Sequence, residues 1–321
     1  MIVVTGGAGF IGSALIWGLN RHGFDDIVIV DSLGEDEKQK NLANLKFADF
    51  VDKDDFVEGL NQFKKVEGII HMGACSSTTE SNTDFLMQNN YEYTKRLALW
   101  ALANSKRFVY ASSAATYGDG SRGFSDDHKL LTEFKPLNAY AHSKQLFDLW
   151  AWREGLLDKI AGLKYFNVFG PNEYHKDEMR SVVCKTFEQI KATGKMKLFK
   201  SHHPDYKDGW QLRDFIYIKD AVEMTLYIYE KHETNGIFNV GTGKARSFFD
   251  LTKTVFRATG RKPQIEYIDM PETIRDKYQY FTQARMEKLH KAGGKGSLHS
   301  LEEAVTDYVQ NYLMADDSYL K

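Results

Sequence analysis

The run MIVVTGGAGFIG at residues 1–12 decides the fold of this chain. Its apolar beginning is followed at once by Gly6, Gly9 and Gly12, and a helical pattern then continues to about His22. Strand, glycine turn and helix in this order are typical of dinucleotide-binding units, because glycines let the backbone approach a diphosphate at a helix N-terminus. The sequence therefore predicts a Rossmann-type unit at its start.

Further strand and helix patterns follow the opening unit. A second apolar strand, residues 27–30, ends in Asp31, where an acid can meet the ribose of adenosine. Strand patterns near residues 67–71, 107–111 and 161–166 alternate with helical ones. This alternation predicts an α/β fold with a doubly wound parallel sheet.

The regular alternation loosens beyond Asn167, which predicts a smaller, mixed α/β substrate-binding lobe. Ligands of such sheets bind at the carboxyl ends of the strands, so we expect the lobe to cover that edge. We assign residues 1–166 and 214–240 to the dinucleotide-binding domain, and residues 167–213 and 241–321 to the lobe.

The composition excludes several classes of protein. A hydrophobic content of 42% over 321 residues supports a sizeable core, and a net charge of −2 gives no basic field for nucleic acid. No apolar run reaches the ~20 residues of a membrane span, and the start lacks the basic leader of a signal peptide. Cys75 and Cys184 form neither a disulfide framework nor a metal pattern. We therefore expect a cytoplasmic protein without a metal, nucleic-acid or membrane partner.

Tyr140 and Lys144 form the second informative pattern, in the run YAHSK. Side chains four residues apart lie on one face of a helix. We expect the ammonium to favour the tyrosinate and so to lower the phenol pKa below its ordinary value of about 10. Such a pair suits an alcohol that loses hydride to a nicotinamide, because the hydroxyl proton must leave as well.

With these segments in place, the chain resembles the extended short-chain dehydrogenase/reductase superfamily over nearly its whole length. The shared motifs are TGGAGFIG, HMGA at 71–74, the Ser113 segment, the Tyr140–Lys144 pair, YFNVFGP at 165–171, RDFIYIKD at 213–220 and FNVGTG at 238–243. Within it, the chain most resembles the ADP-heptose 6-epimerase family. That narrower resemblance rests on GACSSTTE at 73–80, YASSAATYG at 110–118, the Lys176 loop and YQYFTQA at 278–284.

This resemblance implies an isomerase that uses NADP to epimerise ADP-heptose at C6, for the inner core of bacterial lipopolysaccharide. It implies that Tyr140 is an acid/base, that Lys144 supports it, that Ser113 binds the reacting oxygen and that Lys176 is a second acid/base. A second acid/base is useful because inversion presents the hydroxyl in two orientations. The family also suggests a homopentamer.

The glycine turn and the resemblance together give the expected cofactor contacts. Asp31 alone favours NAD, because a carboxylate repels a 2′-phosphate. Lys38 and Lys53 offset this repulsion, so we expect NADP, with NAD as the less favoured cofactor. The expected contacts are Gly6, Gly9, Phe10, Ile11, Gly12, Asp31, Ser32, Lys38, Lys53, Met72, Gly73, Ala74, Cys75, Ser76, Asn89, Lys144, Val168 and Lys176.

The resemblance also gives the expected contacts of the sugar nucleotide. Arg213 can grip a diphosphate with its planar guanidinium, unless a structural ion pair occupies it. The chain departs from the family at Met72, Glu178 and Lys185 and in a longer loop at 200–211, and we expect Glu178 to point outward. The expected contacts are Asn167, Glu178, Lys185, Phe199, Lys200, Ser201, Arg213 and Tyr278.

Two other functions stay open at this point. Another sugar-nucleotide enzyme, such as a UDP-sugar 4-epimerase or a dehydratase, would use the same fold. Ala114 and Ala115 follow Ser113, where a dehydratase would normally place an acid. A non-catalytic NADP-sensing protein is the alternative from another class, although such proteins usually lose the Tyr–Lys pair, which this chain keeps.

Overall fold

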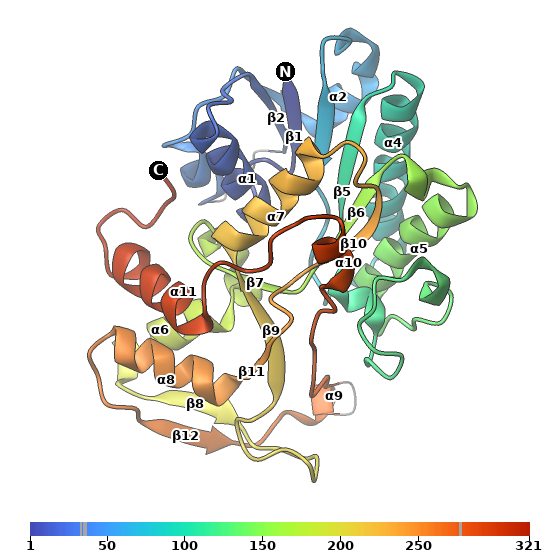
Figure 1. Ribbon diagram of the computed structural model, residues 1–321. Coiled ribbons are helices and arrows are strands. Elements are labelled where there is room, and N and C mark those ends of the chain that lie inside the picture. Colours follow the sequence, from blue (N-terminus) through green and yellow to red (C-terminus); the bar gives the residue numbers. More distant parts are fainter. Residues whose placement is uncertain (33, 35–36, 276–277) are drawn as a thin grey trace.

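The computed structural model describes residues 1–32, 34, 37–275 and 278–321. Its centre is a seven-stranded parallel sheet in the order β10-β6-β5-β4-β1-β2-β3, with α1 and α7 on one face and α4 and α5 on the other (Figure 1). The predicted doubly wound α/β fold is therefore confirmed. The strands are β1 Ile2–Thr5, β2 Ile27–Asp31, β3 Asp49–Asp52, β4 Gly68–His71, β5 Arg107–Ser113, β6 Ala161–Tyr165 and β10 Gly236–Val240.

Helices connect these strands in the alternating order that a parallel sheet requires. The α-helices of this part are α1 Phe10–Arg21, α2 Lys53–Glu58, α3 Thr83–Leu86, α4 Tyr93–Ala103, α5 Ala139–Arg153 and α7 Ile218–Glu230. A π-helical segment, η3 Met87–Glu92, joins α3 to α4. Short 3₁₀ helices are η1 Glu37–Leu42, η2 Leu60–Gln62, η4 Ala114–Tyr117, η5 His128–Leu130, η6 Leu156–Asp158 and η7 Tyr174–Met179.

The turn between β1 and α1 requires glycine at two positions. Gly6 has a φ of +64°, and a Cβ there would lie 2.6 Å from the backbone nitrogen of Gly73. At Gly12 a Cβ would lie 2.0 Å from the Gly6 carbonyl oxygen. Side chains are excluded from both places, so the turn, the helix start and the segment after β4 meet backbone to backbone.

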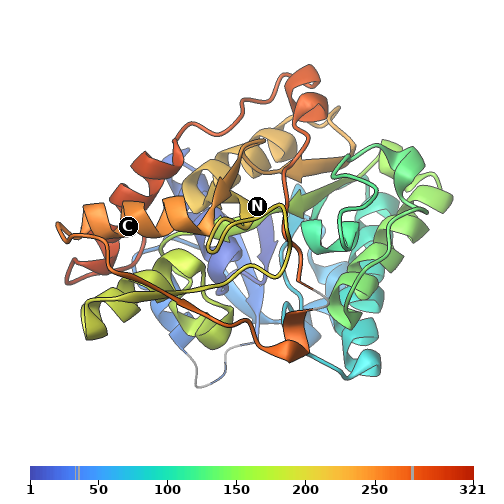
Figure 2. The same cartoon turned by 90° about the horizontal axis from the view of Figure 1, so that it is seen from below.

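A second lobe lies beyond the carboxyl ends of the central strands (Figures 1 and 2). It contains a three-stranded sheet, β11-β9-β7, and a pair, β12-β8. The expected domain boundary at residue 214 falls inside β9, and the chain re-enters the central domain at α7. The elements are β7 Asn167–Phe169, α6 Val182–Thr193, β8 Met196–Phe199, β9 Leu212–Tyr217, β11 Ala245–Ser247, α8 Phe248–Ala258, β12 Ile265–Ile268, α9 Glu272–Arg275, α10 Glu287–Lys291, α11 Leu301–Tyr308 and the π-helical η8 Val309–Leu313.

In the part of the chain that the structure describes, no helix has both the length and the apolar character of a membrane span. Within the same residues, no three or more His, Cys, Asp or Glu side chains gather in a way that would hold a metal ion.

Candidate active site

A cavity of about 620 Å³ lies between the central sheet and the second lobe. Its walls come from the glycine turn, the carboxyl ends of β2, β4 and β5, helix α5, the Lys176 loop and the start of α6. Phe215, Phe248 and Leu251 close it on the side of the lobe. Among the predicted site residues it brings together Gly6, Gly9, Phe10, Ile11, Gly12, Asp31, Lys38, Met72, Gly73, Ala74, Ser76, Ser113, Tyr140, Lys144, Asn167, Val168 and Lys176.

Asp31 lines the cavity at the end of β2. Its carboxylate accepts hydrogen bonds from the backbone nitrogens of Ala8, at 3.0 Å, and Ser32, at 2.8 Å. Lys38 Nζ lies 3.6 Å from Asp31 Oδ1 and 3.4 Å from the Ser32 carbonyl. A cation therefore stands beside the carboxylate that would otherwise repel a 2′-phosphate. Lys53 lies outside the cavity wall, where its ammonium pairs with Asp54 at 2.8 Å.

The segment after β4 is held by Asn90, which sequence analysis did not single out. Asn90 is fully buried, and its amide exchanges two hydrogen bonds of 2.9 Å with the backbone of Cys75. It also donates to Ser143 Oγ at 3.0 Å, which links this segment to α5. The predicted contact Asn89 instead donates to the Phe85 carbonyl at 2.9 Å and does not line the cavity. The π-helical turn of η3 places Asn90 inward.

Tyr140 and Ser113 face each other in the cavity. Asn138 caps α5 by accepting a hydrogen bond from Ala141 N at 2.8 Å, which places Tyr140 in the first turn. A hydrogen bond with Ser113 lowers the pKa of the Tyr140 phenol, but burial raises that pKa by more. The net pKa of Tyr140 therefore lies above its ordinary value.

Lys144 does not act on Tyr140 in the predicted way. Its ammonium donates to the Ala111 carbonyl at 2.8 Å, and burial lowers its pKa to about 8, against the opposing effects of Asp148 and Cys75. The prediction that Lys144 lowers the Tyr140 pKa is wrong for this structure, because the desolvation of the phenol outweighs any help from the lysine. Tyr140 is therefore protonated at neutral pH.

Lys176 lies on a braced loop and faces the glycine turn. Its Nζ is 5.4 Å from the centre of the Phe10 ring, and burial lowers its pKa although Glu173 opposes the shift. The Glu173 side chain is buried and accepts hydrogen bonds from Gly170 N at 3.2 Å, from Ser181 Oγ at 2.7 Å and from Ser181 N. One carboxylate thus joins the two ends of the loop, so Lys176 is not an ordinary surface lysine.

Contacts from distant parts of the chain complete this brace. The Tyr174 hydroxyl donates to the Ser318 carbonyl at 2.7 Å, and Leu320 N donates to Asn172 Oδ1 at 3.0 Å. On the opposite side, the amide of Asn41 lies 3.2 Å from His175 Nδ1. No local sequence pattern announces these contacts, because the partners are 134 to 148 residues apart.

Arg213 lies next to the cavity in an aromatic setting. Its guanidinium carbon is 5.6 Å from the centre of the Phe248 ring and 5.3 Å from that of Tyr278. It donates to the Leu212 carbonyl at 2.9 Å, and the ion pairs found among the described residues do not include it. The alternative of a structural ion pair is therefore not observed. Phe199 packs against Tyr278, with ring centres 6.5 Å apart.

Glu178 and Lys185, at two positions where we expected departures from the family pattern, bind each other. Lys185 Nζ lies 3.0 Å from Glu178 Oε2, and the Glu178 side chain is 94% exposed, so it points outward as expected. Lys200 pairs with Asp269 at 3.3 Å. These side chains lie outside the cavity, and the predicted residues that do not line it are Ser32, Lys53, Cys75, Asn89, Glu178, Lys185, Phe199, Lys200, Ser201, Arg213 and Tyr278.

Some cavity residues were not predicted. Residues 77 and 78 belong to the quoted GACSSTTE run, so the motif held a signal for them. Residues 112, 165, 166 and 215 likewise lie in the quoted runs YASSAATYG, YFNVFGP and RDFIYIKD, although they were not named as contacts. The others belong to none of the quoted motifs. The unpredicted lining includes Ser77, Thr78, Ser112, Tyr165, Phe166, His175, Met179, Arg180, Ser181, Phe215, Phe248 and Leu251.

Comparison with known proteins defines the class. A model of the NAD dependent epimerase/dehydratase family matches residues 2–241, and the chain belongs to that family. An ADP-L-glycero-D-manno-heptose-6-epimerase of Nitratidesulfovibrio vulgaris is 56% identical over 323 residues, with 100% of both chains covered. A protein of the same name from Fusobacterium nucleatum is 47% identical over 332 residues, again with 100% of both covered.

Two solved structures of epimerases are also similar to this chain. The crystal structure of a Helicobacter pylori ADP-L-glycero-D-manno-heptose-6-epimerase superposes with a TM-score of 0.82 at 28% identity, covering 97% of this chain and 95% of that one. A UDP-N-acetylglucosamine 4-epimerase of Methanobrevibacter ruminantium has a TM-score of 0.80 at 23% identity, covering 96% of each chain. The second likeness shows the shared fold alone.

Proposed function

We propose that this protein is an isomerase that converts ADP-D-glycero-β-D-manno-heptose into ADP-L-glycero-β-D-manno-heptose. The observation that carries the proposal is one cavity that holds Tyr140, Ser113 and Lys176 beside a glycine turn. The full-length identity of 56% to a relative named for this reaction supports the choice of sugar.

The glycine turn fits a dinucleotide. Any side chain at Gly12 would meet the Gly6 carbonyl, so the α1 N-terminus stays open for a diphosphate. Asp31 and Lys38 would hold the adenosine end, and Lys144 would reach the nicotinamide ribose. When bound, NADP supplies an acceptor for the C6 hydride and then returns that hydride to the other face.

The residues of the chain supply the proton transfers that accompany this exchange. The C6 hydrogen is not next to a carbonyl, so inversion passes through a ketone, and the C6 hydroxyl loses a proton and later regains it. Burial makes Tyr140 hold its proton and makes Lys176 release its proton more easily than an ordinary lysine. The two groups therefore suit opposite roles, one as donor and one as acceptor, while Ser113 binds the reacting oxygen.

Arg213 supports the nucleotide part of the proposal. A buried guanidinium held between Phe248 and Tyr278 at the cavity edge offers charge-assisted hydrogen bonds to a diphosphate. The outward pairing of Glu178 with Lys185 removes a carboxylate that would oppose such a ligand.

The direct test is proton NMR of ADP-D-glycero-β-D-manno-heptose incubated with the purified protein. We expect inversion at C6 without net consumption of cofactor, because the hydride is returned. UDP-galactose is the comparison substrate. Turnover of UDP-galactose without change in ADP-heptose would favour the UDP-sugar 4-epimerase alternative, and no turnover of either would favour a non-catalytic NADP-sensing protein.

NADP is the cofactor that we propose, on the strength of Lys38. Lys38→Ala should weaken NADP binding about tenfold and leave NAD binding nearly unchanged, because only a 2′-phosphate gains from this cation. Lys40→Ala is a matched control in the same short helix, where the ammonium pairs with Glu37 at 2.5 Å. Equilibrium binding of both cofactors measures the effect, and tighter binding of NAD by the unmodified protein would contradict the choice.

The supply of heptose for lipopolysaccharide and a homopentamer stay predictions from the resemblance, and a cytoplasmic location stays a prediction from the composition. Native mass spectrometry of the purified protein tests the pentamer. A predominant monomer or dimer at micromolar concentration would contradict that prediction.

A further inference from the structure

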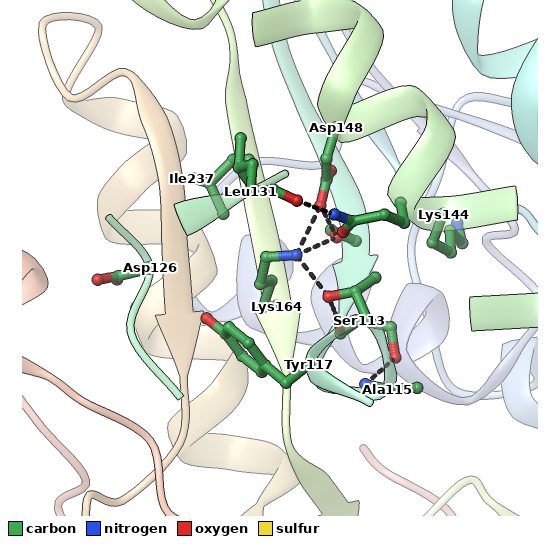
Figure 3. Close-up of polar contacts among 12 residues, drawn as sticks. Ser113, Ala115, Tyr117, Asp126, Leu131, Lys144, Asp148, Lys164 and Ile237 are labelled. Carbon is green, nitrogen blue, oxygen red and sulfur yellow. Dashed lines mark hydrogen bonds and ion pairs between the residues drawn. The ribbon is translucent and has the colours of Figure 1, made fainter. Parts of the chain in front are cut away.

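Beneath the cavity lies a fully buried ion pair between Asp148 of α5 and Lys164 of β6 (Figure 3). Both side chains are 0% exposed, and Lys164 Nζ is 2.6 Å from Asp148 Oδ2. The Asp148 carboxylate also accepts hydrogen bonds from the Tyr110 hydroxyl at 2.9 Å and from Ser112 Oγ at 2.7 Å. Both carboxylate oxygens therefore have donors, so the charge is compensated within the protein.

The pair is connected to Ser113 by two routes. Ser112, which donates to Asp148, is the preceding residue on β5. Lys164 Nζ donates to Thr116 Oγ1 at 2.5 Å, and Thr116 Oγ1 in turn donates to the Ser113 carbonyl at 2.7 Å. A displacement of either charged group would therefore change the position of the serine that faces Tyr140.

The pair is also connected to Lys144. Tyr140, Lys144 and Asp148 follow one another at intervals of four on α5, so they form one row on the helix. Asp148 raises the pKa of Lys144 against the larger effect of burial. Besides Tyr140 in the same row, the ionisable groups near Lys144 include Cys75, which also raises its pKa, and His71 at the end of β4, whose own pKa Lys144 helps to lower.

Stability alone does not account for an ion pair at this depth. Desolvating two charges costs several kcal/mol, and apolar replacements of such pairs are often neutral or stabilising. Hydrogen bonds and charge interactions connect two residues that line the cavity, Ser113 and Lys144, to the Asp148–Lys164 ion pair between α5 and β6. We propose that Asp148 and Lys164 are positioning residues of the active site, which hold Ser113 and Lys144 in register with Tyr140.

The test is an NMR titration of protein labelled with ¹³C at the lysine ε carbons. The Lys144 signal is identified by its loss in Lys144→Arg, and we expect it to titrate near pH 8, below most lysines. In Asp148→Asn the midpoint should fall by about one pH unit, because the carboxylate that favours the ammonium is gone. Lys164→Arg keeps the charge and should keep the midpoint.

This readout needs neither substrate nor cofactor, so it stands apart from the proposed function, on which only the kinetic arm rests. In that arm, the alkaline limb of the kcat profile should move to lower pH in Asp148→Asn, while KM for the sugar nucleotide is unchanged. If Asp148→Asn does not fold, the double variant Asp148→Asn/Lys164→Met removes both charges. It should also lower the midpoint, but by less, because loss of the Lys164 cation acts in the opposite direction. An unmoved midpoint in whichever variant folds, or failure of both to fold, would overturn the proposal.

Discussion

Tyr140→Phe should lower kcat by about 10²–10⁴-fold, the range that a positioned acid/base contributes. The substitution removes only the hydroxyl, which faces Ser113 and which we propose exchanges a proton with the C6 oxygen. The ring stays, so the cavity keeps its shape and NADP binding should survive. Steady-state turnover of ADP-heptose and an equilibrium titration with NADP measure the two effects separately.

Tyr227→Phe is the matched control. Its hydroxyl donates to the Ala292 carbonyl at 2.6 Å, away from the cavity. Loss of that hydrogen bond should cost about 1 kcal/mol of stability and leave turnover near normal. A Tyr140→Phe enzyme that keeps more than a tenth of normal turnover would contradict the acid/base role.

Lys176→Met should lower kcat by a similar factor, about 10²-fold or more, because it removes the second acid/base. Methionine keeps the length of the side chain and can pack on the Phe10 ring, which the ammonium faces at 5.4 Å. The loop should keep its shape, since Glu173 and Ser181 close it without help from Lys176. Turnover of ADP-heptose, with NADP binding measured beside it, checks this expectation.

Lys191→Met, an exposed lysine on α6, controls for the loss of a charge. It should leave both turnover and cofactor binding unchanged. Normal turnover in Lys176→Met would rule out the two-base mechanism and leave Tyr140 as the single proton carrier.

The sequence predicted the central domain well where its strands are apolar. β1, β2, β4, β5 and β6 are buried runs, so composition alone identifies them. β3 escaped notice because its sequence is Asp-Phe-Val-Asp and it lies at the sheet edge, where its residues are exposed or half-buried. The strands β11 and β12 of the second lobe were not predicted for a similar reason, since only one of their residues is fully buried.

The candidate site was predictable where a motif fixes the residue type by chemistry. The glycine turn, Ser113, Tyr140 and Lys176 all reach one cavity. The choice between Asn89 and Asn90 depends on a π-helical turn, which no residue pattern announced. Glu178 and Lys185 pair with each other outside the cavity, so the substrate contacts that the resemblance implies for them stay predictions.

The error over the Tyr140 pKa has a different origin. The spacing of residues on a helix predicts which side chains are neighbours, but it does not predict how deeply a side chain is buried. For Tyr140 the depth decides, because burial opposes the tyrosinate more strongly than the hydrogen bond with Ser113 favours it.

The anchoring of the Lys176 loop by residues 318–320 has a consequence for protein synthesis. Leu320 is translated 148 residues after Asn172, its hydrogen-bond partner. The nascent chain therefore completes its Rossmann unit before residues 318–320 are available to hold the Lys176 loop. Catalytic competence should therefore appear only after the later segment has left the exit tunnel. Premature termination upstream of it should release a protein that binds nucleotide and turns over poorly.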